Sequence, residues 1–437
     1  MALVLAFAST AAAQLSDYLG PGVSTGGASQ IGMRSGQPVD LRFYADVSGV
    51  YDTGLQPVSV DSKGNLVQVN GLYGEELTFG AYGSHQWQHS QLGVDYRGAF
   101  RNYSGNSYYD GIDQQLALGY TLQKSRRLYF GFSGVGGTLS RTIGALTGYY
   151  YLPVQSMVDQ PSSSLFDNRI YFADGEADMT YLLSARTSFT VSGQGFIARR
   201  QSDSLSGVIG YIARGSLQRR MSRATTLGVI YDHMHFGYTQ AFGNSDVNTY
   251  QAFLGAQLGR RWTGYIEAGA FQAEAQGLQE VSVDPAIAAL LGVTTTTEAF
   301  YSKHTFPTGS ATVTRSFKTA SLSASYAKTV TPGNGVYLAS RQEVAAVTYS
   351  YTAVRKLNFS FFAGATRFNS LGQSLQPYWQ ANGGAGVSYT LSRSLHLTAR
   401  YDARRQEIQS SGYNPISYRA TIGLAFSPGS VPLSLWQ

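Results

Sequence analysis

Apolar and polar side chains alternate along most of this chain, in segments separated by connections that are alternately short and long. In the segment 116–122 every second residue is Leu or Tyr, and the residues between them are polar or small. The segment 128–132 repeats the pattern after a break of residues 124–127. A period of two is typical of a β-strand whose two faces meet different surroundings. Two such segments joined by a tight turn predict a β-hairpin.

The same unit recurs in 250–258, 357–363 and 395–401, and continues to the C-terminal region. From Leu41 to Phe426 we count about 18 such strands, with 16 as the alternative, each near the length of about ten residues that crosses a bilayer at a tilt. No apolar run is long enough for a membrane-spanning helix. The predicted fold is therefore an all-β, antiparallel, up-and-down transmembrane β-barrel, because only a closed barrel hides its backbone groups from lipid.

The regions outside the predicted barrel have a different composition. Residues 1–13 are apolar and end in Ala11, Ala12 and Ala13, which is typical of a secretory signal peptide. Residues 14–40 are rich in Gly and lack a sustained period, which predicts a flexible periplasmic segment. The barrel is expected over 41–426, followed by a C-terminal tail over 427–437. The chain contains no Cys, so disulfides and thiolate chemistry are excluded.

The last predicted strand carries a family resemblance. Tyr418, Ala420, Ile422, Leu424 and Phe426 alternate and end in an aromatic residue. This segment resembles the C-terminal strand signal of bacterial outer-membrane β-barrel proteins. The resemblance implies an outer-membrane location, outer-membrane lipid as the surroundings, and the barrel assembly machinery as a partner. The even number of predicted strands returns both termini to the periplasm.

Charge sorts between the two kinds of connection. The short turns are cationic and contain no Asp or Glu; their cations are Lys124, Arg126, Arg127, Arg186, Arg219, Arg220, Arg223, Arg260, Arg261, Arg315, Lys318, Arg355, Lys356 and Arg393. The long connections are expected to hold most acids, including Asp61, Asp110, Asp159, Asp167, Asp203, Asp246, Glu280, Asp284 and Glu298. Cations at one rim can meet anionic headgroups, so we expect the short turns in the periplasm. The net charge of +6 then reflects this rim and does not indicate nucleic-acid binding.

Two connections are expected to be much longer than the others. They run from Arg141 to Arg169 and from Ala275 to Phe306. The second contains Asp284 and Pro285 before an apolar run, which predicts a short helix with Asp as its N-cap. Long loops in ordered domains are commonly functional, and these could fold into the lumen or cap it from outside.

Successive side chains of a strand point to opposite faces, so the odd or even position of a residue, its parity, predicts whether it faces the lumen or the lipid. Three carboxylates, Asp174, Glu176 and Asp178, alternate on one strand and form an acidic wall. Near the two ends of the barrel, the same parity turns six arginines inward as a basic wall: Arg42, Arg97, Arg101, Arg400, Arg404 and Arg419. Facing walls of opposite charge produce a transverse field, as in the general porins that this chain resembles, and select solutes by charge. The alternative is that the arginines pair with neighbours such as Asp46, Asp95 and Asp402.

These features favour a channel for passive diffusion of small hydrophilic solutes or ions. Lumenal aromatic residues could instead stack on sugars in a saccharide-specific porin or an exopolysaccharide secretion channel; the candidates are Tyr129, Tyr265, Phe271 and Tyr378. A structural or adhesive barrel with a plugged lumen is a third alternative. The pattern leaves a homo-oligomeric state open.

Catalysis has the weakest support. His233 and His235 lie beside Asp232, but they share parity with Leu227 and Val229, so we expect them on the lipid-facing side near the outer rim. No G-x-S-x-G or H-E-x-x-H motif is present. We expect no carboxylate of matching parity to be adjacent to these two histidines, and therefore no metal site and no cofactor.

Overall fold

The computed structural model describes residues 40–53, 59–60, 66–67, 71–104, 110–139, 169–201, 205–239, 241–282, 295–332, 338–352, 354–371, 377–408 and 416–427. The predicted signal peptide, nearly all of the N-terminal segment and the tail lie outside these residues, as do the predicted helix after Asp284 and nearly all of the connection from Arg141 to Arg169. Among the described residues, no helix is long and apolar enough to cross a bilayer.

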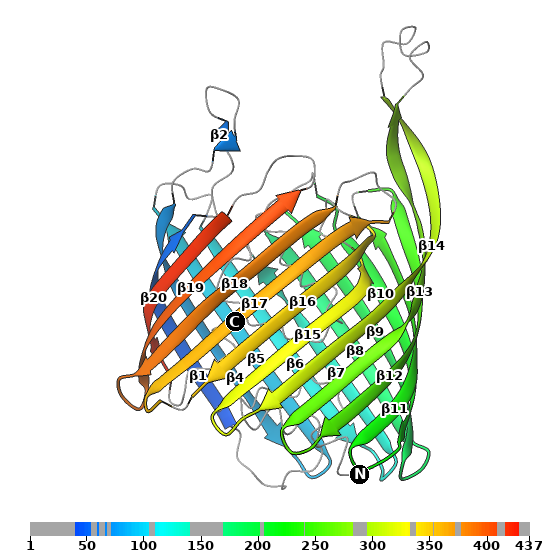
Figure 1. Cartoon of the computed structure of the whole chain (residues 1–437), viewed down its shortest axis with the longest axis horizontal. Coiled ribbons are helices and arrows are strands. Elements are labelled where there is room, and N and C mark those ends of the chain that lie inside the picture. Colours follow the sequence, from blue (N-terminus) through cyan, green and yellow to red (C-terminus); the bar gives the residue numbers. More distant parts are fainter. Residues whose placement is uncertain are drawn as a thin grey trace.

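Eighteen antiparallel strands form one closed sheet (Figure 1). Each strand pairs with its neighbours along the chain, and β1 closes the barrel by pairing with both β4 and β20. The strands are β1 (Asp40–Asp52), β4 (Leu72–Gln86), β5 (Ser90–Tyr103), β6 (Gly111–Gln123), β7 (Leu128–Leu139), β8 (Ile170–Leu182), β9 (Thr187–Arg200), β10 (Val208–Arg220), β11 (Thr225–Tyr238), β12 (Gly243–Leu258), β13 (Trp262–Ser282), β14 (Thr295–Ser316), β15 (Ala320–Thr331), β16 (Ser340–Tyr351), β17 (Leu357–Ser370), β18 (Tyr378–Thr390), β19 (Leu395–Ile408) and β20 (Ile416–Phe426). A separate small hairpin pairs β2 (Ser59–Val60) with β3 (Leu66–Val67). The predicted count of about 18 strands is confirmed, and the alternative of 16 is wrong.

The barrel carries apolar side chains on its outer face and polar side chains on its inner face, the reverse of a water-soluble protein. On β11, Leu227 and Val229 point outward and are 47% and 55% exposed, whereas Thr226 and Asp232 point inward and are each 8% exposed. The same alternation of apolar outward and polar inward residues recurs on the other strands. An apolar outer surface of this kind is stable only against lipid, so the barrel crosses a membrane.

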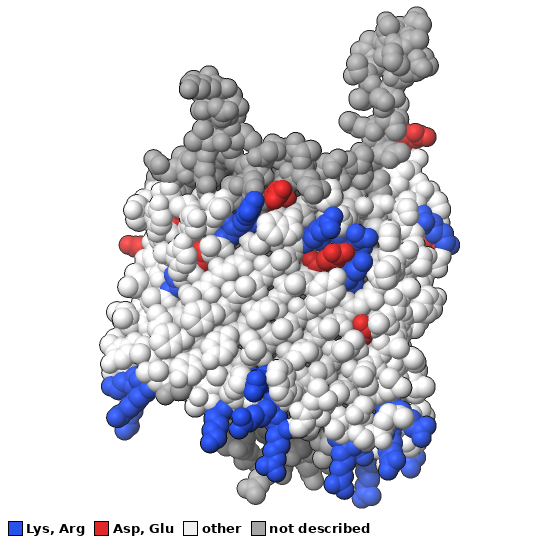
Figure 2. All heavy atoms as spheres, in the orientation of Figure 1, with Lys and Arg blue, Asp and Glu red and all other residues white. Residues whose placement is uncertain are grey.

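The two rims differ in charge. Lys and Arg side chains gather along the lower rim, where Figure 1 shows the short turns between strands (Figure 2). The first residue of β1, Asp40, pairs with Ser84 near one short turn, and Phe426 at the end of β20 pairs with Leu395 beside another. The barrel therefore begins and ends at its cationic rim.

The prediction of a long loop from Ala275 to Phe306 is wrong. The β13–β14 ladder continues up to the pair Ser282 and Thr295, although β12 begins only at Gly243, opposite Gly277. This hairpin therefore extends beyond the rest of the wall (Figure 1). Glu280 and Glu298 lie in it, and Asp246 lies in β12, so none of these three acids is in a loop. Above the membrane both faces of a strand meet water, so the apolar alternation that marks the other strands is absent here.

The wall is discontinuous between β14 and β15. Their ladder covers only the eight pairs from Gly309 with Lys328 to Ser316 with Ser321. Above it, the Arg341 guanidinium of β16 lies 5.3 Å from the ring centroid of the inward-facing Phe306 on β14. Ser302 of β14 also donates from Oγ to the carbonyl of Leu371, at the end of β17, at 3.3 Å. The upper ends of β15–β17 therefore pass on the lumenal side of the β13–β14 hairpin.

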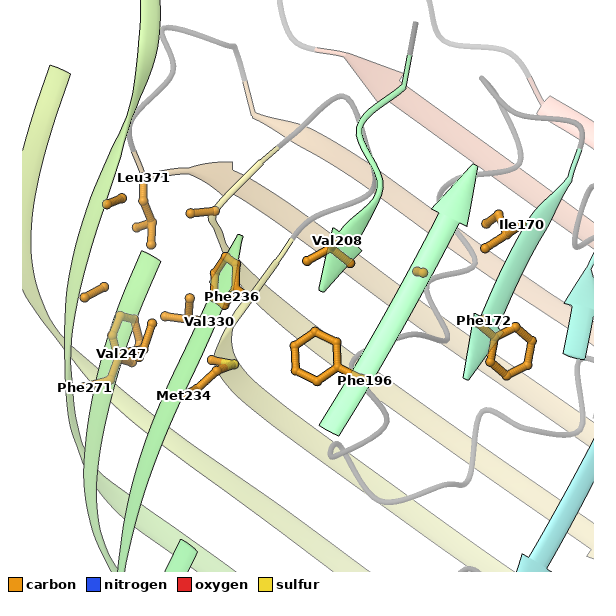
Figure 3. Packing of buried hydrophobic residues seen from close by; sticks show 14 residues of the cluster. Ile170, Phe172, Phe196, Val208, Met234, Phe236, Val247, Phe271, Val330 and Leu371 are labelled. Carbon is orange, nitrogen blue, oxygen red and sulfur yellow. The ribbon is translucent and has the colours of Figure 1, made fainter. Parts of the chain in front are cut away.

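An apolar cluster fills the space where these strand ends meet the inner wall (Figure 3). Val330 of β15 and Leu371 pack there with Phe236, Val247 and Phe271, which face inward from β11–β13. These five side chains are between 0% and 9% exposed. The cluster narrows the lumen toward the rim opposite the short turns.

Candidate functional site

The lumenal face of β8 carries three carboxylates. Asp174, Glu176 and Asp178 alternate with exposed, lipid-facing residues and are themselves half-buried. Gln194 on β9 donates from Nε2 to Oδ2 of Asp174 at 2.5 Å. Among the residues that the structure describes, none forms an ion pair with any of the three. Their negative charge is therefore left to solvent, ions and solutes in the lumen.

The acidic character extends along the same side of the barrel. On β10 and β11, Arg214 forms an ion pair with Asp232, in which Nη2 and Oδ2 are 3.1 Å apart. Glu267 on β13 accepts hydrogen bonds from the hydroxyls of Tyr265 and of Ser310, the latter at 3.1 Å. Away from the two rims, the described inward-facing charges of β8–β14 are therefore five carboxylates and one arginine.

The opposite side of the lumen is charged but internally neutralised. Arg97 binds Asp95 through two hydrogen bonds, Nε to Oδ1 at 3.0 Å and Nη2 to Oδ2 at 2.8 Å. Arg400 binds Asp402 at 2.7 Å. Two further pairs link different strands, Arg101 of β5 with Asp113 of β6 and Arg419 of β20 with Glu76 of β4. The side chains of these two inter-strand pairs are only 3–5% exposed.

The basic wall predicted from strand parity is thus not a wall of net positive charge. On β19, β20, β1 and β4–β6 the described inward positions hold six arginines, Arg42, Arg97, Arg101, Arg400, Arg404 and Arg419, and six carboxylates, Asp46, Asp52, Glu76, Asp95, Asp113 and Asp402. Arg97 and Arg400 pair with the neighbours Asp95 and Asp402 that the alternative interpretation named. Parity places these two pairs on one face of their own strands, whereas the pairs of Arg101 and Arg419 depend on how different strands are aligned.

Three of the four predicted sugar-stacking rings are buried. Phe271 and Tyr378 are each 1% exposed, and Tyr129 is 8% exposed. Phe271 belongs to the apolar cluster, and Tyr378 packs on Phe368 with ring centroids 6.1 Å apart. Tyr265 is half-buried, and its hydroxyl is bound to Glu267. Phe271 and Tyr378 therefore offer no open ring face to a sugar.

His233 and His235 lie on the outer face of β11, as parity predicts. Asp232 lies on the inner face and points to Arg214. The prediction that no carboxylate of matching parity is adjacent is wrong in space. Asp246 on β12 lies opposite His235 in the ladder, with Oδ1 and Nδ1 2.8 Å apart. Among the described residues, no group of three or more His, Cys, Asp or Glu side chains is arranged to hold a metal ion.

The sequence contains a signal for the apolar cluster that strand parity alone does not reveal. On β11 the inward positions Met234 and Phe236 are apolar, whereas the inward positions Thr226 and Asp232 of the same strand are polar. Because an open lumen is filled with water, apolar side chains on the inner wall are expected where other apolar side chains cover them. This pattern predicts that the inner wall is covered at this level, although it does not identify the covering residues.

Several solved structures resemble this chain. They include Pseudomonas aeruginosa OccK2 (OpdF) in complex with glucuronate (11% identity, TM-score 0.43, 89% of this chain and 98% of that chain covered) and a BenF-like porin from Pseudomonas fluorescens Pf-5 (11%, 0.43, 89% and 99%). Acinetobacter baumannii OccAB3 is similar at 7% identity, with a TM-score of 0.39 and coverage of 89% and 99%. No family model and no curated protein matches the chain. At these identities and TM-scores the likeness carries no argument about solutes, and the fold rests on the strand ladders described above.

Proposed function

We propose that this protein is an outer-membrane channel for passive diffusion of small hydrophilic solutes or ions, with a preference for cations. The observation that carries the proposal is the acidic face of β8, where Asp174, Glu176 and Asp178 are half-buried toward the lumen with no ion-pair partner among the described residues. Unpaired charges on a pore wall select solutes by charge. The paired side of the lumen adds little net field because its charges balance.

The short-turn rim is assigned to the periplasm because its cations suit an anionic inner leaflet. Both ends of the barrel lie at this rim, so both termini are periplasmic in this orientation. Phe426, the last residue of β20, is 54% exposed on the outer face. It is accessible there to the barrel assembly machinery.

Single-channel recording of the refolded protein in planar bilayers tests the proposal. A channel gives discrete ohmic current steps in KCl, whereas a barrel plugged for a structural or adhesive role gives none. Heat-modifiable migration in electrophoresis verifies folding in the same preparation. Oligosaccharides added to the bath should leave the steps unblocked, because Phe271 and Tyr378 are buried; sugar-dependent block would favour a saccharide channel.

A further inference from the structure

Apolar side chains on the outer face of β15–β19 give way abruptly to charged ones toward the long-loop rim. On β17 the outward positions are apolar from Leu357 to Ala365, and the next outward residue is Arg367. From Leu357 to Arg367 the strand spans about 33 Å along its length, or about 25 Å along the membrane normal at a tilt of about 40°. Arg367 therefore lies where the hydrocarbon ends and the headgroups begin.

The neighbouring strands change at the same level. The ladders place Lys328 of β15 opposite Glu343 of β16, Glu343 opposite Arg367, and Arg367 opposite Trp379 of β18. The last apolar outward residues before these positions are Tyr326 on β15 and Ala345 on β16. Figure 2 shows basic and acidic side chains gathered below the upper rim, on the face where Figure 1 places the upper ends of β15–β17.

Three cations belong to this group, which we call the basic row: Lys328, Arg367 and Arg405. Only two carboxylates accompany them, and their contacts are long. Glu343 is shared, with its Oε1 at 3.5 Å from Lys328 Nζ and 3.6 Å from Arg341 Nε. Glu407 Oε2 lies 3.9 Å from Arg405 Nη2. Arg367 is exposed and forms no ion pair with any described residue.

At the same level, the outward positions of the adjacent strands β11–β14 hold two carboxylates and one lysine. On β11–β14 the ladder aligns His235, Asp246, Glu274 and Lys303 on the outer face. There Lys303 Nζ lies 2.6 Å from Glu274 Oε1, a tight pair. Among the described outward residues of β11–β19, the excess of positive charge thus lies on β15–β19, next to the seam where the β14–β15 ladder ends at Gly309 and Lys328.

We propose that the basic row binds the phosphorylated headgroup of a lipid in the leaflet at the long-loop rim. Arginine and lysine at the end of an apolar band attract phosphate, and arginine binds it through two parallel hydrogen bonds. Lys328 and Arg367 are two strand spacings apart, about 10 Å, so one headgroup that carries two phosphates reaches both. The apolar band below, from Ala365 to Leu357, accommodates the acyl chains. Trp379 stands between Arg367 and Arg405 as an interfacial aromatic residue.

The test measures binding of diphosphorylated lipid A to the full-length protein in nanodiscs of zwitterionic lipid, by native mass spectrometry across a concentration series. The variant Lys328→Gln with Arg367→Gln removes two cations of the row and retains the stacking of Arg341 on Phe306. Each cation near a charged surface accounts for about a fivefold change in affinity, so the double variant should bind at least tenfold more weakly. An unchanged affinity overturns the proposal.

Two control variants distinguish binding at the basic row from non-specific attraction of the lipid to any cation of the protein. Lys303→Gln removes a lipid-facing cation at the same rim, and Arg355→Gln with Lys356→Gln removes two cations from the short turn between β16 and β17. Both should keep the affinity within about twofold. If they lose as much as the double variant, attraction is non-specific and the row is not a site.

Lipid A without its phosphates should bind the wild type as weakly as the double variant binds the phosphorylated form. Equal binding of both lipids would assign the contact to the acyl chains and overturn the proposal. Inorganic phosphate at millimolar concentration should displace no lipid, because it lacks the bilayer anchor. Channel conductance should be the same in all variants, so this result is independent of the channel proposal.

Discussion

The two sides of the lumen use charge in opposite ways. On β19, β20, β1 and β4–β6, arginines and carboxylates balance, and pairs such as Arg419 with Glu76 are almost completely buried. On β8, Asp174, Glu176 and Asp178 are half-buried and have no ion-pair partner among the described residues. The buried pair of Arg419 on β20 and Glu76 on β4 links the two strands on either side of β1 but contributes little field at a distance. Unpaired carboxylates contribute little to stability and set the potential that a solute meets.

The largest expected effect comes from breaking one buried pair. Glu76→Gln leaves the Arg419 guanidinium, which is 5% exposed, without its carboxylate. The free energy of unfolding should fall by about 3–5 kcal/mol, measured by equilibrium denaturation in detergent micelles. The matched change Glu176→Gln on the acidic side should alter it by less than about 0.5 kcal/mol. Similar losses in both variants would mean that the two sides do not differ.

The next effect is on ion selectivity. Asp174→Asn, Glu176→Gln and Asp178→Asn together remove the unpaired charge of β8 while keeping the size of each side chain. Under a KCl gradient, the ratio of cation to anion permeability should fall severalfold, because wall charges contribute potentials of a few kT. The reversal potential should move toward that of an unselective pore. An unchanged value would remove these residues from the conducting path.

The smallest effect is expected when a whole pair is removed from the neutral side. Asp95→Leu with Arg97→Met deletes both charges of a pair whose side chains are 5% exposed. Selectivity should not change, because the net charge of the wall does not change. Stability should be nearly unaffected or improved, whereas Asp95→Leu alone should cost about 3–5 kcal/mol. A selectivity shift in the double variant would show that the paired side also faces permeating ions.

The strands inside the membrane were predictable, and the elements beyond it were not. Lipid on one side and water on the other impose a period of two, so the hairpin of β6 and β7 is visible in the sequence. The upper parts of β13 and β14 have water on both sides and lack this period. They remain strands because they pair with each other, from Gly277 with Phe300 to Ser282 with Thr295.

The sequence predicts which side chains point into the lumen, but it does not predict which residues contact them there. Parity turns Asp174 and Arg419 inward correctly, but the partner of Arg419 is Glu76, 343 residues away in the chain. Phe271 faces inward as expected, yet Val330 and Leu371 cover it because the upper ends of β15–β17 pass inside β14. Such contacts between distant segments depend on closure of the barrel, which no single strand encodes.

The difference in charge between the two sides of the lumen is best measured as the reversal potential of the wild-type channel in a tenfold KCl gradient. The acidic side carries five carboxylates and one arginine away from the rims, and the other side is balanced. We therefore expect a reversal potential of the sign given by cation preference. Raising the salt toward 1 M should weaken this preference as the Debye length falls to about 3 Å. A reversal potential of zero, or one of the sign for anion preference, would show that the carboxylates of β8 do not control permeation.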